Sequence, residues 1–66
     1  METMARVREL LEERHLSLYK LSLMSGISYT TLNTTAKRNG QLSVDTIERI
    51  CTCLQIPLAE FFVRGS

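Results

Sequence analysis

Residues 17–38 read SLYKLSLMSGISYTTLNTTAKR, and this stretch decides the fold that we expect for the chain. Ser17 is a good N-cap, because a serine oxygen can accept a hydrogen bond from an unpaired amide of the first helical turn. Gly26 ends the helix that follows, since glycine adopts the left-handed turn conformation without a steric clash. Ser28 is a second cap, and a second helix runs from there to about Lys37. The stretch therefore predicts two short helices joined by a tight turn.

Two helices joined by a turn of three to four residues with a glycine form a helix-turn-helix. On a helical wheel, Leu32, Thr35 and Ala36 lie on the side of the second helix that faces the core. The opposite side carries side chains that can contact a base edge or a phosphate, and none of them is acidic. These outward residues are Thr30, Asn33, Thr34 and Lys37, with Tyr29 at the edge of the same face.

The run from Leu16 to Arg38 resembles the DNA-binding domain of phage-repressor and Cro-like regulators, the Xre family. The likeness continues through SVDTIERICTCLQIPLAEFF and so covers roughly residues 4–63. It depends on features at fixed spacing: Ser17, Leu21, Gly26, Ile27, Ser28, Leu32, Ser43 and the ending Pro57–Phe62. The chain departs from the family pattern at four positions. Ser22 and Thr35 replace an alanine and an aliphatic residue, and Leu23 and Met24 stand where polar or charged residues are usual.

The charge of the chain is unevenly distributed, although its net value is only +1. From Arg14 to Val44 there is no Asp or Glu, and four cations give this part +4, whereas the remainder carries −3. The positive part contains the predicted helix-turn-helix. This asymmetry favours a nucleic-acid-binding face, and the alternative is a chance arrangement on a solvated surface.

A length of 66 residues corresponds to one domain. Cys51 and Cys53 are two positions apart on a predicted helix, so their side chains diverge and cannot form a disulfide. The ligand number and spacing of a zinc site are also lacking. We therefore expect free thiols in a reducing cytoplasm, with no metal and no cofactor. No apolar run reaches the length of a membrane span or an export signal.

Three further helices are expected outside the central stretch. The first opens at residues 2–4 with Thr3 as its cap, and four residues recur at the spacing of a half-buried helix: Val7, Leu10, Leu11 and Arg14. Ser43 caps the next, which runs to residue 54 and buries Ile47, Ile50, Cys51 and Leu54. Cys53 lies on the more exposed side of that helix.

After a break at Gln55-Ile56-Pro57, residues 58–63 form a final turn or two of helix. We expect Leu58, Phe61 and Phe62 to close the core. The alternative is that one phenylalanine forms part of a dimer interface with Val63.

The sequence thus predicts an all-α bundle of five short helices in one domain, residues 1–66, with the helix-turn-helix at 17–38 and a loose tail at 64–66. The resemblance implies that the helix from Tyr29 to Lys37 enters the major groove of double-stranded DNA. The expected base-reading residues are Tyr29, Thr30, Asn33 and Thr34. The expected phosphate contacts are Ser17, Lys20, Lys37, Arg38 and Gln41.

No pair of catalytic groups can be assigned around the single histidine, His15, so an enzyme is not expected. We expect a cytoplasmic, nucleoid-associated transcriptional repressor that occupies a pseudo-palindromic operator as a homodimer. No small-molecule effector is indicated. The alternative is a protein-binding module of the same fold, of the antitoxin or anti-repressor type, with a contact patch at Leu18, Leu23 and Met24.

Overall fold

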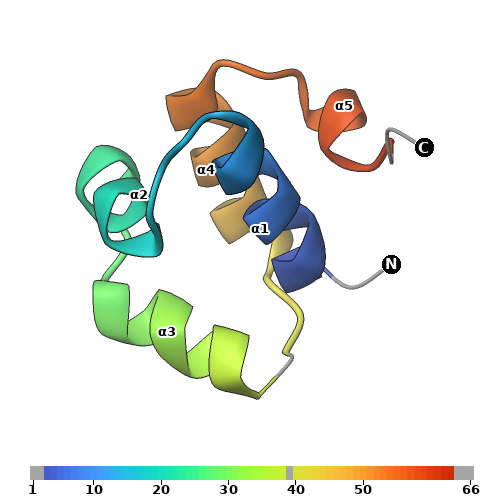
Figure 1. Cartoon of the computed structure of the whole chain (residues 1–66). Coiled ribbons are helices and arrows are strands. Elements are labelled where there is room, and N and C mark those ends of the chain that lie inside the picture. Colours follow the sequence, from blue (N-terminus) through green and yellow to red (C-terminus); the bar gives the residue numbers. More distant parts are fainter. Residues whose placement is uncertain (1–2, 39, 64–66) are drawn as a thin grey trace.

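The computed structural model describes residues 3–38 and 40–63, and these residues form a bundle of five α-helices (Figure 1). The helices are α1 (Thr3–Glu13), α2 (Leu18–Ser25), α3 (Tyr29–Lys37), α4 (Val44–Leu54) and α5 (Leu58–Phe61). The predicted all-α class and the predicted order of elements are confirmed. Asn39 and the tail predicted at 64–66 lie outside the described residues.

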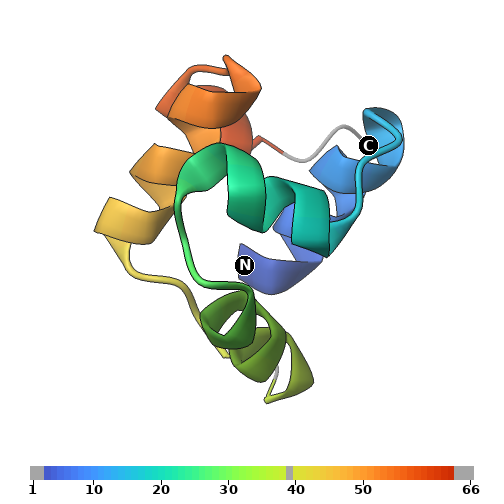
Figure 2. The same ribbon diagram turned by 90° about the vertical axis from the view of Figure 1, so that its left-hand side faces the viewer.

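The helix-turn-helix consists of α2, a short turn and α3. The Lys20 amide donates a hydrogen bond to Ser17 Oγ over 3.0 Å, so Ser17 caps α2 as predicted. Gly26 ends α2 with a φ of 75°, and its amide donates to the Ser22 carbonyl. Only glycine adopts this left-handed angle without strain. Figure 2 shows α2 crossing the middle of one side of the molecule, with α3 below it.

Ser28 occupies the N-cap position of α3, but its hydroxyl makes no capping hydrogen bond, so this part of the prediction is wrong. The backbone gives the reason. Its ψ is 133° at Ser28, compared with 163° at Ser17 and 160° at Ser43, where the hydroxyls do accept first-turn amides. At Ser43 the bond from the Thr46 amide is 3.2 Å long.

The core lies where all five helices meet and is almost entirely apolar. It consists of Met4, Val7, Leu10, Leu11, Leu21, Ile27, Leu32, Ala36, Ile47, Ile50, Cys51, Leu54, Ile56 and Phe61. The core positions predicted for α4 are therefore confirmed, as are Val7, Leu10 and Leu11 of α1, whereas Arg14 follows the end of α1 and is half-buried. Cys51 is buried and Cys53 is half-buried, in the predicted order, and both thiols are free.

Thr3 is the first residue of α1 but does not cap it, which corrects the prediction. Its hydroxyl instead joins α1 to the chain after α3, because it accepts from the Leu42 amide over 2.7 Å. The Thr3 amide and hydroxyl both donate to the side-chain oxygen of Gln41, over 2.9 and 3.0 Å. A residue from a distant part of the sequence thus satisfies an amide at the start of α1.

Arg6 is buried in α1, with 6% of its surface exposed, and fastens α5 to the bundle. Its Nε donates to the Phe61 carbonyl over 2.6 Å and its Nη2 to the Glu60 carbonyl over 2.9 Å. Its Nη1 pairs with Glu9 over 3.1 Å. A buried arginine requires such partners, because an unpaired buried charge is costly.

Of the three residues expected to close the core at the C-terminal end, only Phe61 does so. Leu58 is 38% exposed and Phe62 is 48% exposed, so the prediction that all three are buried is wrong. The helix is a single turn that ends at Phe61, and Arg6 holds the carbonyls of that turn against α1. A helix of one turn places only one of its large side chains, Phe61, fully in the core.

Candidate nucleic-acid interface

The outer face of α3 is polar and exposed, and the inner face is apolar. Leu32 and Ala36 are buried against the rest of the bundle, which orients the helix. Thr30, Thr34 and Lys37 are exposed on the opposite side. Threonine offers both a methyl group and a hydroxyl to base edges, and lysine offers a cation to phosphates.

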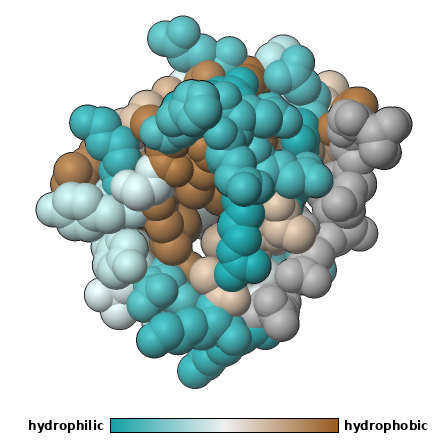
Figure 3. Space-filling view, viewed as in Figure 1, coloured by the Kyte–Doolittle hydropathy of each residue, from teal (hydrophilic) through white to brown (hydrophobic). Residues whose placement is uncertain are grey.

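Asn33 lies at the edge of this face and not at its centre. It is half-buried and lines a groove of about 500 Å³ together with residues of α1 and of the start of α2. The other lining residues are Arg8, Leu11, Glu12, Leu16, Leu18 and Ala36. Figure 3 shows apolar side chains gathered in the hollow between α1 and α2. Thr30 and Thr34, by contrast, are exposed on the outer face.

The start of α2 lies beside the start of α3. The rings of Tyr19 and Tyr29 meet edge to face, with their centroids 5.9 Å apart. Lys20 is exposed in the same turn of α2, and Ser17 is exposed while its oxygen accepts the Lys20 amide. The structure thus brings Tyr29 into contact with Tyr19, the residue that precedes the predicted phosphate-binding residue Lys20 in the sequence.

The residues predicted to bind phosphate after α3 differ in their surroundings. Arg38 is exposed at the end of α3, next to Lys37. Gln41 is exposed as a residue, yet its side-chain oxygen accepts the two bonds from Thr3. Gln41 consequently has a structural role at α1 that the sequence did not reveal.

Three exposed residues of this region were not among the predicted site residues. Thr31 is exposed three positions before Thr34, and residues at this spacing are neighbours on a helix surface. Ser28 precedes the first turn of α3 with no side-chain capping bond. Tyr19 contacts Tyr29. The spacing of Thr31 could have identified it, whereas the other two depend on backbone angles and on tertiary packing.

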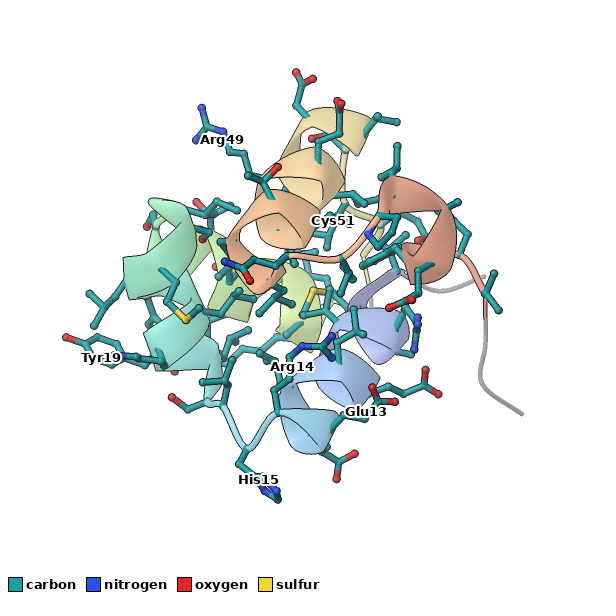
Figure 4. The ribbon with its side chains drawn as sticks, turned by 90° about the horizontal axis from the view of Figure 1, so that it is seen from above. Glu13, Arg14, His15, Tyr19, Arg49 and Cys51 are labelled. Atoms are coloured by element: carbon teal, nitrogen blue, oxygen red, sulfur yellow. The ribbon has the colours of Figure 1, made fainter. Side chains whose placement is uncertain are left out.

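The acid-free stretch forms the surface that carries α2 and α3, and three of its four cations are exposed: Lys20, Lys37 and Arg38. The fourth, Arg14, is half-buried and pairs with Glu13 over 3.5 Å (Figure 4). Its contribution to the positive face is therefore reduced. Exposed cations on a stretch of chain without acidic residues attract a polyanion, and one acid next to this region is Glu12, which lines the groove beside Asn33.

The titratable groups of the described residues form no other candidate site. Burial raises the pKa of the Cys51 thiol and also that of Cys53, so both favour the protonated form. Within residues 3–38 and 40–63, no three His, Cys, Asp or Glu side chains are grouped as metal ligands. No helix in the same part of the chain has the length and apolarity needed to cross a membrane.

A short helix fixed by its apolar face, a glycine turn and a second helix with an exposed polar face define this chain as a helix-turn-helix protein. A family model described as a Cro/C1-type helix-turn-helix DNA-binding domain matches residues 6–64. The chain belongs to this family, and its partner class is double-stranded DNA. A comparison with curated proteins found no match, and neither did a comparison with solved structures.

Proposed function

We propose that this chain is a transcriptional repressor that acts by occupying an operator, with α3 in the major groove. The observation that carries the proposal is the outer face of α3, which exposes Thr30, Thr34 and Lys37 and lies in a stretch of sequence, residues 14–44, that has no acidic residue. A helix of this width fits the major groove, where each base pair presents a distinct pattern of donors and acceptors. Occupation of such a site blocks access of other proteins to the same DNA.

Within this proposal, the centre of the α3 face reads bases and its margins contact phosphates. Thr30 and Thr34 contact thymine methyl groups or base edges, and Asn33 and Tyr29 read from the two margins. Phosphate contacts come from Lys20, Lys37 and Arg38, with Ser17 and Gln41 as polar neighbours. Lys20 lies on α2 and Lys37 on α3, so the contacts involve both helices of the motif.

The proposed operator complex is a homodimer on a pseudo-palindrome. One small domain covers little DNA, and two copies on half-sites about one helical turn apart gain both affinity and specificity. An exposed apolar surface is present for this contact: Leu58 and Phe62 lie four residues apart, and Val63 is next to them. Figure 1 shows α5 on the opposite side of the molecule from α2, so a partner on α5 leaves the helix-turn-helix accessible.

Selection of genomic fragments by the purified protein, followed by sequencing and footprinting, tests this function. The expected result is protection of two related half-sites with a centre-to-centre separation of about one helical turn. Light scattering with the operator should give the mass of two chains per duplex. Equal retention of all fragments would contradict sequence-specific repression, and one chain on one half-site would contradict the homodimer.

A second candidate function, a protein-binding module of the antitoxin or anti-repressor type, is favoured by the exposed Leu23 and Met24 on α2. Leu18 was expected in the same patch, but it is half-buried and packs against the core. The patch is therefore smaller than the sequence suggested. Weak binding to every DNA sequence, with a strong dependence on salt, would favour this candidate.

A further inference from the structure

Tyr19 and Tyr29 form an exposed aromatic pair that joins the first turn of α2 to the first turn of α3. Their centroids are 5.9 Å apart and their rings are inclined by 70°. Both remain open to solvent, Tyr19 at 58% and Tyr29 at 42% of their surface. In Figure 4 the Tyr19 side chain points away from the body of the protein.

We propose that Tyr19 is a positioning residue for DNA recognition: its ring holds Tyr29 in the orientation in which the Tyr29 hydroxyl contacts the DNA. This inference depends on the proposed function, because it assigns a role at the same DNA-binding face. Tyr19 belongs to α2, so the sequence pattern of α3 does not indicate this role.

The physical argument begins with the freedom of Tyr29. An exposed tyrosine near the start of a helix can rotate about its side-chain bonds, and that freedom must be lost when its hydroxyl binds a fixed acceptor. An edge-to-face neighbour removes part of the freedom before binding, because this arrangement of rings is favoured by their quadrupoles. Preorganisation of this kind strengthens binding without adding a contact to the ligand.

The surroundings of the pair favour a phosphate or a base edge as the acceptor. Tyr19 is followed by the exposed Lys20, and no acidic residue occurs between Arg14 and Val44. A phenol hydroxyl can donate to a phosphate oxygen or to a base acceptor, and tyrosine is among the side chains that contact the DNA backbone. The pair also exposes two aromatic rings that the DNA would cover in the complex.

The composition of the chain gives a direct signal for the test. The chain has two tyrosines and no tryptophan, so all of its tyrosine fluorescence comes from this pair. Titration of the full chain with the footprinted operator duplex should change this emission. In the Tyr19→Phe variant all of the emission comes from Tyr29, so the change at Tyr29 can be measured alone. Unchanged emission on saturation with operator would overturn the proposed contact.

Affinities for the operator separate positioning from direct contact. Tyr19→Ala is expected to raise Kd about fivefold, which corresponds to the free energy that one aromatic pair contributes. Tyr19→Phe keeps the ring and should bind like the parent. In a Tyr29→Ala background, Tyr19→Ala should add little, because the residue that it positions is gone. Leu23→Ala, an exposed change on the same helix, is the matched control and should leave Kd unchanged.

Two results of the affinity measurements would also overturn the inference while leaving the proposed function intact. In the first, Tyr19→Ala binds the operator like the parent. In the second, the effects of Tyr19→Ala and Tyr29→Ala add in full, which would mean that the two rings act independently. Failure of the parent to prefer operator over a random duplex of equal length would instead remove the proposed function itself. Circular dichroism of each variant confirms that it is folded, and the exposure of both rings predicts that it will be.

Discussion

Helices α3 and α4 follow the same sequence signal, a serine before a helix of similar length, yet the structure uses them differently. At α4 the Ser43 oxygen caps the helix, Asp45 lies in the first turn, and four residues are buried. At α3 the Ser28 hydroxyl makes no capping bond and only two residues are buried. Helix α4 is therefore stabilised by the cap at its N-terminus and by the burial of its apolar face in the core. The bundle holds α3 by one narrow face, Leu32 and Ala36, and leaves the remainder exposed or half-buried, where we propose the contacts with DNA.

The largest expected difference between the two helices is in stability. Ile50 of α4 is fully buried, so Ile50→Ala should lower the free energy of unfolding by about 2–5 kcal/mol through the loss of apolar contacts and the cavity that remains. Ile50→Val is the milder variant and should cost about 0.5–1.5 kcal/mol. Urea unfolding followed by circular dichroism measures both. An alanine variant as stable as the parent would contradict the view that α4 anchors the fold.

In DNA binding we expect the opposite order: a substitution on α3 should have an effect and a matched substitution on α4 should have none. Thr34→Ala on the outer face of α3 should cost about 1–2 kcal/mol on the operator, with little loss on unrelated DNA. Thr52→Ala, an exposed threonine on α4, is the matched control and should bind the operator like the parent. Neither change should lower thermal stability by much, since both side chains are exposed. If both variants bind like the parent, Thr34 does not read a base.

The contrast between the two helices also shows how much the sequence could predict. The apolar periodicity of α1 and α4, the glycine turn, the serine positions and the break before α5 located the helices, because these signals are local. The buried face of α3 was likewise predicted from the spacing of Leu32 and Ala36. These features depend on residues close together in the sequence.

Apart from the missing cap at Ser28, which depends on a local backbone angle, the errors arose where residues distant in the sequence meet. The sequence predicts Thr3 as a cap, but Thr3 forms hydrogen bonds with Gln41 and Leu42, which follow the helix-turn-helix in the sequence. Leu58 and Phe62 were expected in the core, but Arg6 of α1 fixes α5 in another position. The Tyr19–Tyr29 contact was also missed. Helical spacing carries no information about which partner a side chain meets across the bundle.

A smaller effect tests the two serines directly. Ser43→Ala should lower the free energy of unfolding by about 1 kcal/mol, because it removes the acceptor of the Thr46 amide. Ser28→Ala removes no capping bond and should change stability by at most a few tenths of a kcal/mol. The two variants carry the same substitution at equivalent positions, so each is the control of the other. Equal losses would mean that Ser28 caps α3 in solution.

The smallest expected effect is in the salt dependence of DNA binding, and it distinguishes two exposed cations, Lys37 of α3 and Arg49 of α4. Both residues are exposed, and Figure 4 shows the Arg49 side chain directed away from the body of the protein. Lys37 lies on the proposed DNA face and should neutralise one phosphate, which releases a condensed counterion.

Lys37→Ala should therefore weaken binding to all DNA sequences alike and reduce the slope of log K against log salt by about one. Arg49→Ala lowers the net charge by the same amount, but it should leave the slope unchanged because Arg49 is not among the proposed phosphate contacts. Fluorescence anisotropy at several salt concentrations, on operator and on random duplex, gives both slopes. Equal changes for the two variants would show that the slope follows net charge rather than a contact of α3. If Lys37→Ala weakens the operator but not the random duplex, Lys37 reads a base, and the division of α3 into a base-reading centre and phosphate-binding margins must be redrawn.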